Sequence, residues 1–408
     1  MPLSNPWTWV NLTNMVWIDQ PVGTGFSQGT PNATSSEDAA VQFLSFWKNF
    51  VDLFGLHGRK VFITGESFAG QYVPYIAAAM LDQNDKSYFN VSGIMIYDPS
   101  FGWPQISKQV PIVAFTDAHQ QSFPFNETFK KEIHERSSSC GYDSFLSEGL
   151  SFPPTGPLPS PPGLDSNGTV TQECDLLSSI YTAAVALNPC FNIYEAGSLC
   201  PIAWDVLGTT TTNPASSSSH VPADTFVVAE PYFNRTSVKA AIHAPLDSTW
   251  HLCTPTPVIA NFTDLSPPSG LTGGPLQRVV EATRNVVVAH GARDMVLLSA
   301  GSLLTLQNLT WDGAQGFGAA PTASFYVPSA RGAGKAAGAG VLGRWVSERG
   351  MTFCTVELSG HEVPAYQPAA AFRQLEFLLG RIDDLSATTG FSTEMGAEEL
   401  GLVEADCY

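Results

Sequence analysis

The most constraining feature of this sequence is a serine held among small residues, where an apolar run passes into a helical pattern. Residues 60–64 read as a short strand, and Gly-Glu-Ser-Phe-Ala-Gly follows directly. A serine on a tight strand-to-helix turn has a strained backbone, so its neighbours must be small. Gly65, Ala69 and Gly70 meet that requirement around Ser67. We therefore interpret this stretch as a nucleophile elbow, which lifts the serine hydroxyl clear of a sheet.

The elbow also leaves the Phe68 N–H at a helix N-terminus, where it can donate to a developing oxyanion. The simpler alternative is a serine that caps a helix after a glycine turn. The pattern also arises by chance in a chain with 35 glycines, so the rest of the sequence has to decide. A second glycine-rich loop, residues 20–27, has neither G-x-G-x-x-G nor a lysine, which argues against nucleotide binding.

Strand-like and helical patterns alternate along the chain. Predicted strands cover residues 14–19, 60–64, 94–97, 285–290 and 353–358, and predicted helices cover residues 36–54, about 69–82 and 369–379. This alternation predicts an α/β fold with a mostly parallel sheet and helices on its faces. In the first helix, an aromatic stripe at helical spacing is expected in the core; its members are Phe43, Phe46, Trp47 and Phe50.

The pattern changes in the middle of the chain, where turns, prolines and four cysteines gather. We expect a discontinuous core of residues 1–98 and 246–382. Residues 99–245 would form an inserted, disulfide-stapled cap, a natural place for substrate selectivity. The acidic tail, residues 383–408, is expected to have little to bury and to be mobile.

The charge balance excludes several classes of partner. Lys and Arg total 19 against 37 Asp and Glu, which gives a net charge of −18 and a pI near 4.7. Such acidity argues against nucleic acid and against an anionic membrane surface. No apolar run reaches the length of a membrane span.

Glycosylation motifs point to the secretory route. Eight Asn-x-Ser/Thr sequons occur, at Asn11, Asn32, Asn90, Asn126, Asn167, Asn234, Asn261 and Asn308. The first six residues have neither the basic nor the apolar region of a signal peptide, so we expect the beginning of the chain to be absent.

Seven cysteines fit an oxidising compartment. Four of them lie within about sixty residues and allow three disulfide pairings; they are Cys140, Cys174, Cys190 and Cys200. None has the spacing of a zinc site, so no metal or cofactor is expected. Three are left over: Cys253, Cys354 and Cys407.

A serine hydroxyl needs a base to take its proton, and the base needs a carboxylate to orient it. Ser67, Asp294 and His361 each follow a predicted strand by a few residues, so all three should lie at the carboxyl edge of the sheet. Their order along the chain is that of α/β-hydrolases. His361 alone among the eight histidines lies beyond both the elbow and Asp294.

Three motifs in this order resemble the serine carboxypeptidases. They are residues 19–27 (Asp-Gln-Pro-Val-Gly-Thr-Gly-Phe-Ser), residues 65–70, and residues 360–364 (Gly-His-Glu-Val-Pro), with a fungal-type stretch at residues 306–311. The resemblance covers roughly residues 1–98 and 230–382. It implies an α/β-hydrolase fold, a secreted or vacuolar location, and release of C-terminal residues from peptides at acidic pH.

The resemblance also implies a role for each matching residue. Ser67 would be the nucleophile, His361 the general base and acid, and Asp294 its orienting partner. The Phe68 N–H would supply half of the oxyanion hole. Glu66 would help bind the terminal carboxylate of the substrate, which requires a shared proton and favours low pH.

Two departures from the family pattern stand out. The family aspartate two positions before the catalytic one is Ala292 here, which is expected to loosen the Asp294 loop. The upstream motif Asn-Gly-Gly-Pro-Gly-Cys-Ser-Ser, which supplies the second oxyanion donor, has no match. Its cysteine would have paired with Cys253. We therefore expect a truncated N-terminus that lacks the first strands, and impaired activity.

Two other functions stay open on the sequence alone. One is another acyl-transfer enzyme on the same scaffold, an acyltransferase or an esterase. The other is a secreted glycoprotein without turnover that uses its cap for binding. The preferred side chain at the cleaved end and the oligomeric state do not follow from the sequence.

Overall fold

A computed structural model describes residues 5–200, 230–252, 254–260, 263–329 and 338–394. Its centre is a six-stranded sheet in the order β1-β2-β3-β8-β7-β6. The strands are β1 (Val61–Glu66), β2 (Val91–Tyr97), β3 (Val286–Gly291), β8 (Met351–Val356), β7 (Gly340–Glu348) and β6 (Ala323–Val327). The first four are parallel and the last two join antiparallel. The predicted α/β fold with a mostly parallel sheet is confirmed.

Helices cover both faces of the sheet, so its central strands are apolar on both sides. In β2, Met95 and Tyr97 pack with α11, whereas Ile94 and Ile96 pack with α2, α8 and α9. These helices are α2 (Ala69–Asp82), α8 (Pro275–Thr283), α9 (Ser299–Asn308) and α11 (Pro368–Leu378). The period of two along each strand therefore assigns every other residue to one of two cores.

The first long helix, α1 (Ser36–Phe54), has the predicted bounds. The Ser35 side chain caps its N-terminus, and Gly55, with a φ of 62°, ends it. The helix packs on α2, with Phe43 buried. The prediction that the aromatic stripe lies in the core is confirmed for Phe43, against which Trp47 packs, and is wrong at Phe46, which is 42% exposed.

The predicted strand at residues 14–19 is absent from the structure. These residues pair with no neighbouring strand, and Trp17 is 73% exposed. Of this run, only Ile18 packs against the apolar cluster that α1 and α2 form with Phe89. An apolar run becomes a strand only where an adjacent strand takes up its backbone hydrogen bonds, and here β1 is the edge of the sheet.

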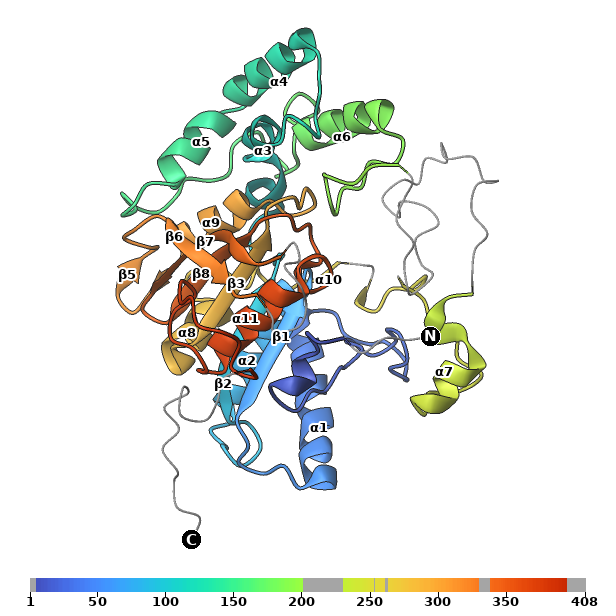
Figure 1. The fold of residues 1–408 in the computed structure, drawn as a ribbon. Coiled ribbons are helices and arrows are strands. Elements are labelled where there is room, and N and C mark those ends of the chain that lie inside the picture. Colours follow the sequence, from blue (N-terminus) through green and yellow to red (C-terminus); the bar gives the residue numbers. More distant parts are fainter. Residues whose placement is uncertain (1–4, 201–229, 253, 261–262, 330–337, 395–408) are drawn as a thin grey trace.

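Residues 105–200 alternate helices and loops. Their helices gather at the end of the molecule opposite α1 (Figure 1); they are η2 (Gln105–Gln109, a π-helix), α3 (Ile112–Ala118), α4 (Glu127–Ser139), α5 (Tyr142–Gly149) and α6 (Leu176–Leu187). Disulfides join Cys140 to Cys174 and Cys190 to Cys200. The predicted stapled cluster is confirmed, and one of the three pairings is selected.

The remaining cysteines and short elements complete the described fold. Cys354 is a free, buried thiol in β8, and Cys253 and Cys407 lie outside the described residues. The short elements are η1 (Trp9–Asn11), η4 (Tyr232–Asn234), α7 (Thr236–Ala241), β4 (Thr310–Trp311), β5 (Ala314–Gln315) and α10 (Val363–Tyr366). Within the described ranges, no helix has both the length and the apolar character needed to cross a bilayer.

Seven of the eight sequons fall in the described residues. Four asparagines are exposed: Asn11, Asn32, Asn126 and Asn167. Three are half-buried and use their side chains in hydrogen bonds: Asn90, Asn234 and Asn308. Asn261 lies outside the described residues, and glycosylation itself stays a prediction.

The expectation that the tail has little to bury is wrong for residues 383–394. Leu385 and Phe391 are fully buried in the core under α11. The Phe391 ring lies 5.6 Å from that of Phe372, and the buried Glu376 accepts a hydrogen bond from the Ser392 N–H. A few apolar residues in an acidic stretch were enough to anchor it. Residues 395–408 lie outside the described part.

Truncation of Phe391 tests this anchoring. Phe391→Ala should lower the free energy of unfolding by about 3–5 kcal/mol, because it leaves a cavity in the main core. Leu53→Ala on α1, where the side chain is 77% exposed, should cost less than about 0.5 kcal/mol. Urea unfolding of both variants measures the difference, and equal losses would show that the tail does not stabilise the core.

Candidate active site

Ser67 lies at the turn between β1 and α2 with a φ of 59°, a left-handed conformation that is strained for serine. The turn is held from the next strand: the Ser67 N–H donates to the Tyr97 carbonyl at 2.9 Å, and the Ser100 N–H donates to the Ser67 carbonyl at 2.9 Å. A Cβ at Gly65 would lie 2.5 Å from Ala69 Cβ. The nucleophile-elbow geometry predicted from the sequence is therefore present.

Phe68 stands at the N-terminus of α2. Its own backbone is helical, with φ −61° and ψ −17°, and its ring is 42% exposed. Among the hydrogen bonds of the described residues, none occupies the Phe68 N–H. This donor is available to an oxygen atom bound beside Ser67, at the positive end of the helix dipole.

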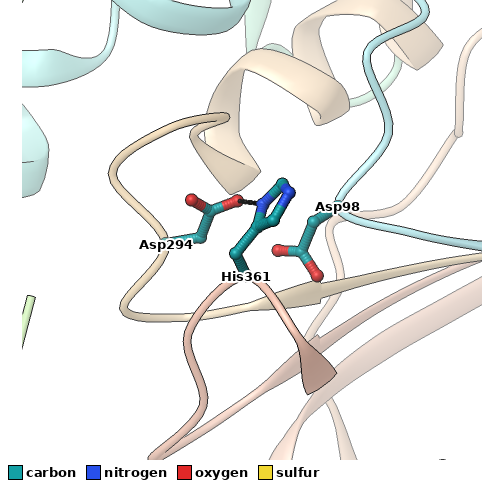
Figure 2. A group of neighbouring side chains, drawn as sticks. All are labelled: Asp98, Asp294 and His361. Carbon is teal, nitrogen blue, oxygen red and sulfur yellow. Dashed lines mark hydrogen bonds and ion pairs between the residues drawn. The ribbon is translucent and has the colours of Figure 1, made fainter. Parts of the chain in front are cut away.

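Asp294 and His361 meet in the loops that follow β3 and β8. These strands pair in parallel from Val286↔Met351 to Gly291↔Val356, so both loops leave the same edge of the sheet. The His361 Nδ1 lies 2.7 Å from Asp294 Oδ2 (Figure 2). Both side chains are buried, with 3% of His361 and none of Asp294 exposed.

The backbone around Asp294 fixes its orientation. Its Oδ1 accepts hydrogen bonds from Val296 N–H at 2.7 Å and from Leu297 N–H at 3.3 Å. The other oxygen is thus left for the imidazole, and the Nδ1–H of His361 donates to it. This arrangement leaves Nε2 as the ring nitrogen able to accept a proton.

The third predicted residue, Ser67, lies at the same edge but is not directly bonded to the pair. None of the hydrogen bonds of the described residues joins its hydroxyl to His361. Its neighbour Glu66 is close enough to His361 for each to shift the pKa of the other. The hydrogen bond between a catalytic hydroxyl and its base is often long without substrate and shortens when substrate binds.

Glu66 is a carboxyl group that favours its proton. Burial is the main cause, and it raises the pKa of Glu66 to about 7. The positive form of His361 opposes this shift, while the charges of Glu362 and Asp294 reinforce it. Glu66 is therefore mostly neutral at acidic pH and mostly ionised at alkaline pH.

His361 is subject to opposing influences. Burial disfavours its charged form and is the largest influence, yet the net pKa is raised because Asp294 attracts and hydrogen-bonds the imidazolium. The negative charges of Glu66 and Glu362 add to the rise. Protonation of Glu66 removes one of these charges, so it makes His361 easier to deprotonate.

A loop closed by the disulfide Cys190–Cys200 reaches the two loops that carry Asp294 and His361. The Tyr194 carbonyl accepts a hydrogen bond from the His361 N–H at 2.7 Å, and the Ile193 carbonyl accepts one from the Met295 N–H at 3.0 Å. The rings of Tyr194 and His361 are 5.3 Å apart. This contact was not predictable from the sequence, since nothing in a turn-rich segment indicates which loop returns to the sheet.

Two further titratable residues, Asp98 and His290, lie at the ends of β2 and β3 and were not predicted as site residues. Both are fully buried. Oxygen and nitrogen atoms of Asp98, Asp294 and His361 lie within 4.8 Å of one another (Figure 2), close enough to surround a cation. The Nδ1 of His361 is already bonded to Asp294, however, which suits a proton-transfer pair better than a set of metal ligands. The position of Asp98 at the end of a predicted strand was the available signal.

Comparisons with known proteins agree with this geometry. A family model described as serine carboxypeptidase matches residues 1–380. A "Probable serine carboxypeptidase" of Arthroderma benhamiae is 47% identical over 397 residues, covering 94% of this chain and 72% of the relative. "Serine-type carboxypeptidase F" of Aspergillus niger is 40% identical over 409 residues, covering 94% of this chain and 73% of the relative.

A solved structure shares the fold. It is that of Kex1(Δ)p, a prohormone-processing carboxypeptidase from Saccharomyces cerevisiae, with a TM-score of 0.64 and 20% sequence identity. The match covers 94% of this chain and 77% of that structure. The predicted α/β-hydrolase fold is therefore confirmed.

The raised pKa of Glu66 predicts a pH-dependent stability. A carboxyl whose pKa is higher in the folded state stabilises the fold below its unfolded pKa, and this stabilisation is lost as the pH rises through about 7. The Glu66→Gln variant has no such carboxyl and does not lose this stabilisation. The free energy of unfolding of the variant minus that of wild type should therefore be larger at pH 8 than at pH 4, by on the order of 2 kcal/mol. Urea unfolding of both proteins at both pH values measures this.

The exposed Glu173 provides the matched control. Glu173→Gln should differ from wild type by the same amount at pH 4 and at pH 8. A Glu66→Gln difference that is just as constant would contradict the raised pKa.

Proposed function

The chain belongs to the serine carboxypeptidase family, and we propose that it releases C-terminal amino acids from peptides through an acyl-enzyme formed on Ser67. The observation that carries the proposal is the buried Asp294–His361 hydrogen bond at the sheet edge where Ser67 forms the elbow. Serine carboxypeptidases are peptidases.

The proposed reaction begins with attack of Ser67 Oγ on the carbonyl carbon of the last peptide bond. His361 Nε2 takes the hydroxyl proton, and Asp294 stabilises the resulting imidazolium. The carbonyl oxygen becomes an oxyanion that accepts a hydrogen bond from the Phe68 N–H. When the C–N bond breaks, His361 returns the proton to the leaving amine. Water then attacks the acyl-enzyme in the same way and frees Ser67.

Glu66 is proposed to bind the terminal carboxylate of the peptide. Two carboxyl groups can share such a contact only if one of them holds a proton, and the pKa of Glu66 near 7 supplies that proton at acidic pH. The same protonation lowers the tendency of His361 to become charged. Both effects favour activity on the acidic side of neutrality, although the raised pKa of His361 limits how far activity extends into acid.

The inserted segment, residues 99–245, is proposed to form the cap that selects the substrate, over a core of residues 1–98 and 246–382. This division is supported by a cluster of apolar side chains drawn mostly from residues 106–196, which Met295, Leu298 and Leu304 of the core join. It is also supported by the Cys190–Cys200 loop, which lies against His361. Side chains of this loop border any ligand that approaches the imidazole.

A secreted or vacuolar location is proposed with this function. The two disulfides of the described residues form and persist in oxidising compartments. The eight sequons would be glycosylated on the same route.

The function is tested with N-blocked dipeptides between about pH 4 and pH 6. Release of the free C-terminal amino acid, slowed because the family motif that supplies the second oxyanion donor has no match in this sequence, is the expected result, and it should be lost by at least about 10³-fold in Ser67→Ala. Mass spectrometry of the digest of a longer peptide should show residues leaving one at a time from the C-terminus. Internal fragments instead would contradict the exopeptidase assignment.

A fluorophosphonate probe separates turnover from folding. Wild-type protein should be labelled on Ser67, and neither Ser67→Ala nor denatured protein should be labelled. Labelling without release of amino acids from peptides, but with cleavage of esters, would favour the esterase alternative. No labelling of folded protein would contradict the proposed nucleophile.

A further inference from the structure

A second buried carboxyl group lies beside the Asp294–His361 pair, and the proposed reaction does not use it. Asp98 follows β2 and has no exposed surface. Figure 2 shows Asp98 and Asp294 both beside the His361 imidazole, and atoms of the three side chains lie within 4.8 Å of one another. The charge on either carboxyl group therefore affects the pKa of this one histidine.

Asp98 is bonded to the turn that carries Asp294. Its Oδ1 accepts a hydrogen bond from the Gly291 N–H at 2.9 Å and lies 2.8 Å from His290 Nδ1. The Asp98 backbone N–H donates to the Ala289 carbonyl at 2.8 Å. Gly291 comes three residues before Asp294, so the Asp98 carboxyl fixes the point at which the chain leaves β3.

The turn needs such an anchor. The resemblance to the family predicts a carboxylate at position 292, inside the turn itself, and this chain has Ala292 there. Asp98 instead provides a carboxyl from the neighbouring strand. The Tyr194 loop of the cap supports the turn from the other side, through the bond from Met295 N–H to Ile193.

The surroundings of Asp98 disfavour a negative charge on it. The titratable groups facing it come from every element around it: Glu66 of β1, Tyr97 of β2, His290 of β3, Asp294 of the turn after β3, and His361 of the turn after β8. Burial is the main reason that the pKa of Asp98 is raised well above its usual value, and the charge of Asp294 is the next. Its second oxygen is buried and accepts no hydrogen bond from the described residues, and a hydrogen bond with the Asp294 carboxyl, which needs a proton between the two groups, adds to the rise in pKa.

The neighbouring histidine does not compensate for a charge on Asp98. Burial lowers the pKa of His290 to about 4, so this ring is neutral through most of the acidic range. Its Nε2 lies 2.7 Å from the Ser302 hydroxyl, a neutral partner. Asp98 and His290 therefore form a neutral pair rather than an ion pair.

We propose that Asp98 is a positioning residue. In its protonated, neutral form, the Asp98 carboxyl holds the Asp294 turn without placing a second negative charge beside His361. An ionised carboxylate at this distance moves the pKa of a neighbouring group by about 1–3 units. Such a shift in His361 would keep the base protonated at acidic pH and stop it from accepting the serine proton. This inference rests on the proposed roles of Asp294 and His361.

Two variants separate the anchor from the proton. Asp98→Asn keeps an oxygen for the Gly291 N–H but cannot ionise, and Asp98→Ala removes the anchor. For Asp98→Asn, we expect the acid limb of the pH profile of kcat/KM to move by less than about 0.3 units, because the native group is already neutral. For Asp98→Ala, we expect kcat/KM to fall by about 10- to 100-fold relative to Asp98→Asn, since Asp294 and His361 lose their alignment.

The measurement uses a blocked dipeptide and the folded protein, with thermal unfolding of each variant as the check on folding. A shift of the Asp98→Asn acid limb to lower pH by about one unit or more would mean that the native Asp98 is charged, and the proposal would be wrong. Equal kcat/KM in Asp98→Asn and Asp98→Ala would mean that Asp98 positions nothing.

A spectroscopic readout tests the proton without turnover. Infrared difference spectra of wild type against Asp98→Asn at pH 6 should contain the carbonyl stretch of a protonated carboxyl, and a carboxylate band in its place would overturn the proposal. This readout also decides the question if Asp98→Ala does not fold. It is independent of the proposed function, whose own failure would appear as wild-type protein that no fluorophosphonate labels.

Discussion

The site depends on one buried hydrogen bond, between His361 Nδ1 and Asp294 Oδ2. An imidazole this deeply buried would lose its proton affinity without a carboxylate beside it, because burial disfavours the charged form. The carboxylate in turn is tolerated because two backbone N–H groups and the imidazole satisfy it. The parallel pairing of β3 with β8 brings the two loops together, so the register of two central strands determines whether the base can work.

The charges around this bond are balanced by protonation rather than by lysine or arginine. Burial gives Glu66 and Asp98 raised pKa values, so both can be neutral where the enzyme is proposed to work. Each ionised carboxyl near His361 raises its pKa and makes it a less available base. A site with several acids can thus keep one working histidine at acidic pH only while most of those acids hold their protons.

Local signals made much of the site predictable. The small residues around Ser67 indicate a strained turn, and the positions of Asp294 and His361 after apolar runs predict one sheet edge. Features that depend on a distant partner were not predictable: residues 14–19 look like a strand but pair with nothing, and Phe391 looks like part of a solvated tail but packs under α11. Asp98 was passed over for the same reason, because its importance comes from the strand beside it.

The central claim is that Ser67, His361 and the Phe68 N–H act on one bound carbonyl, and a crystal structure of the protein after fluorophosphonate labelling tests it most directly. The account predicts phosphorus on Ser67 Oγ, a phosphoryl oxygen within about 3.1 Å of Phe68 N, and His361 Nε2 within hydrogen-bonding distance of an oxygen on the phosphorus. A phosphonylated Ser67 whose adduct lies out of reach of His361, while the hydrogen bond between His361 and Asp294 is intact, would contradict the account.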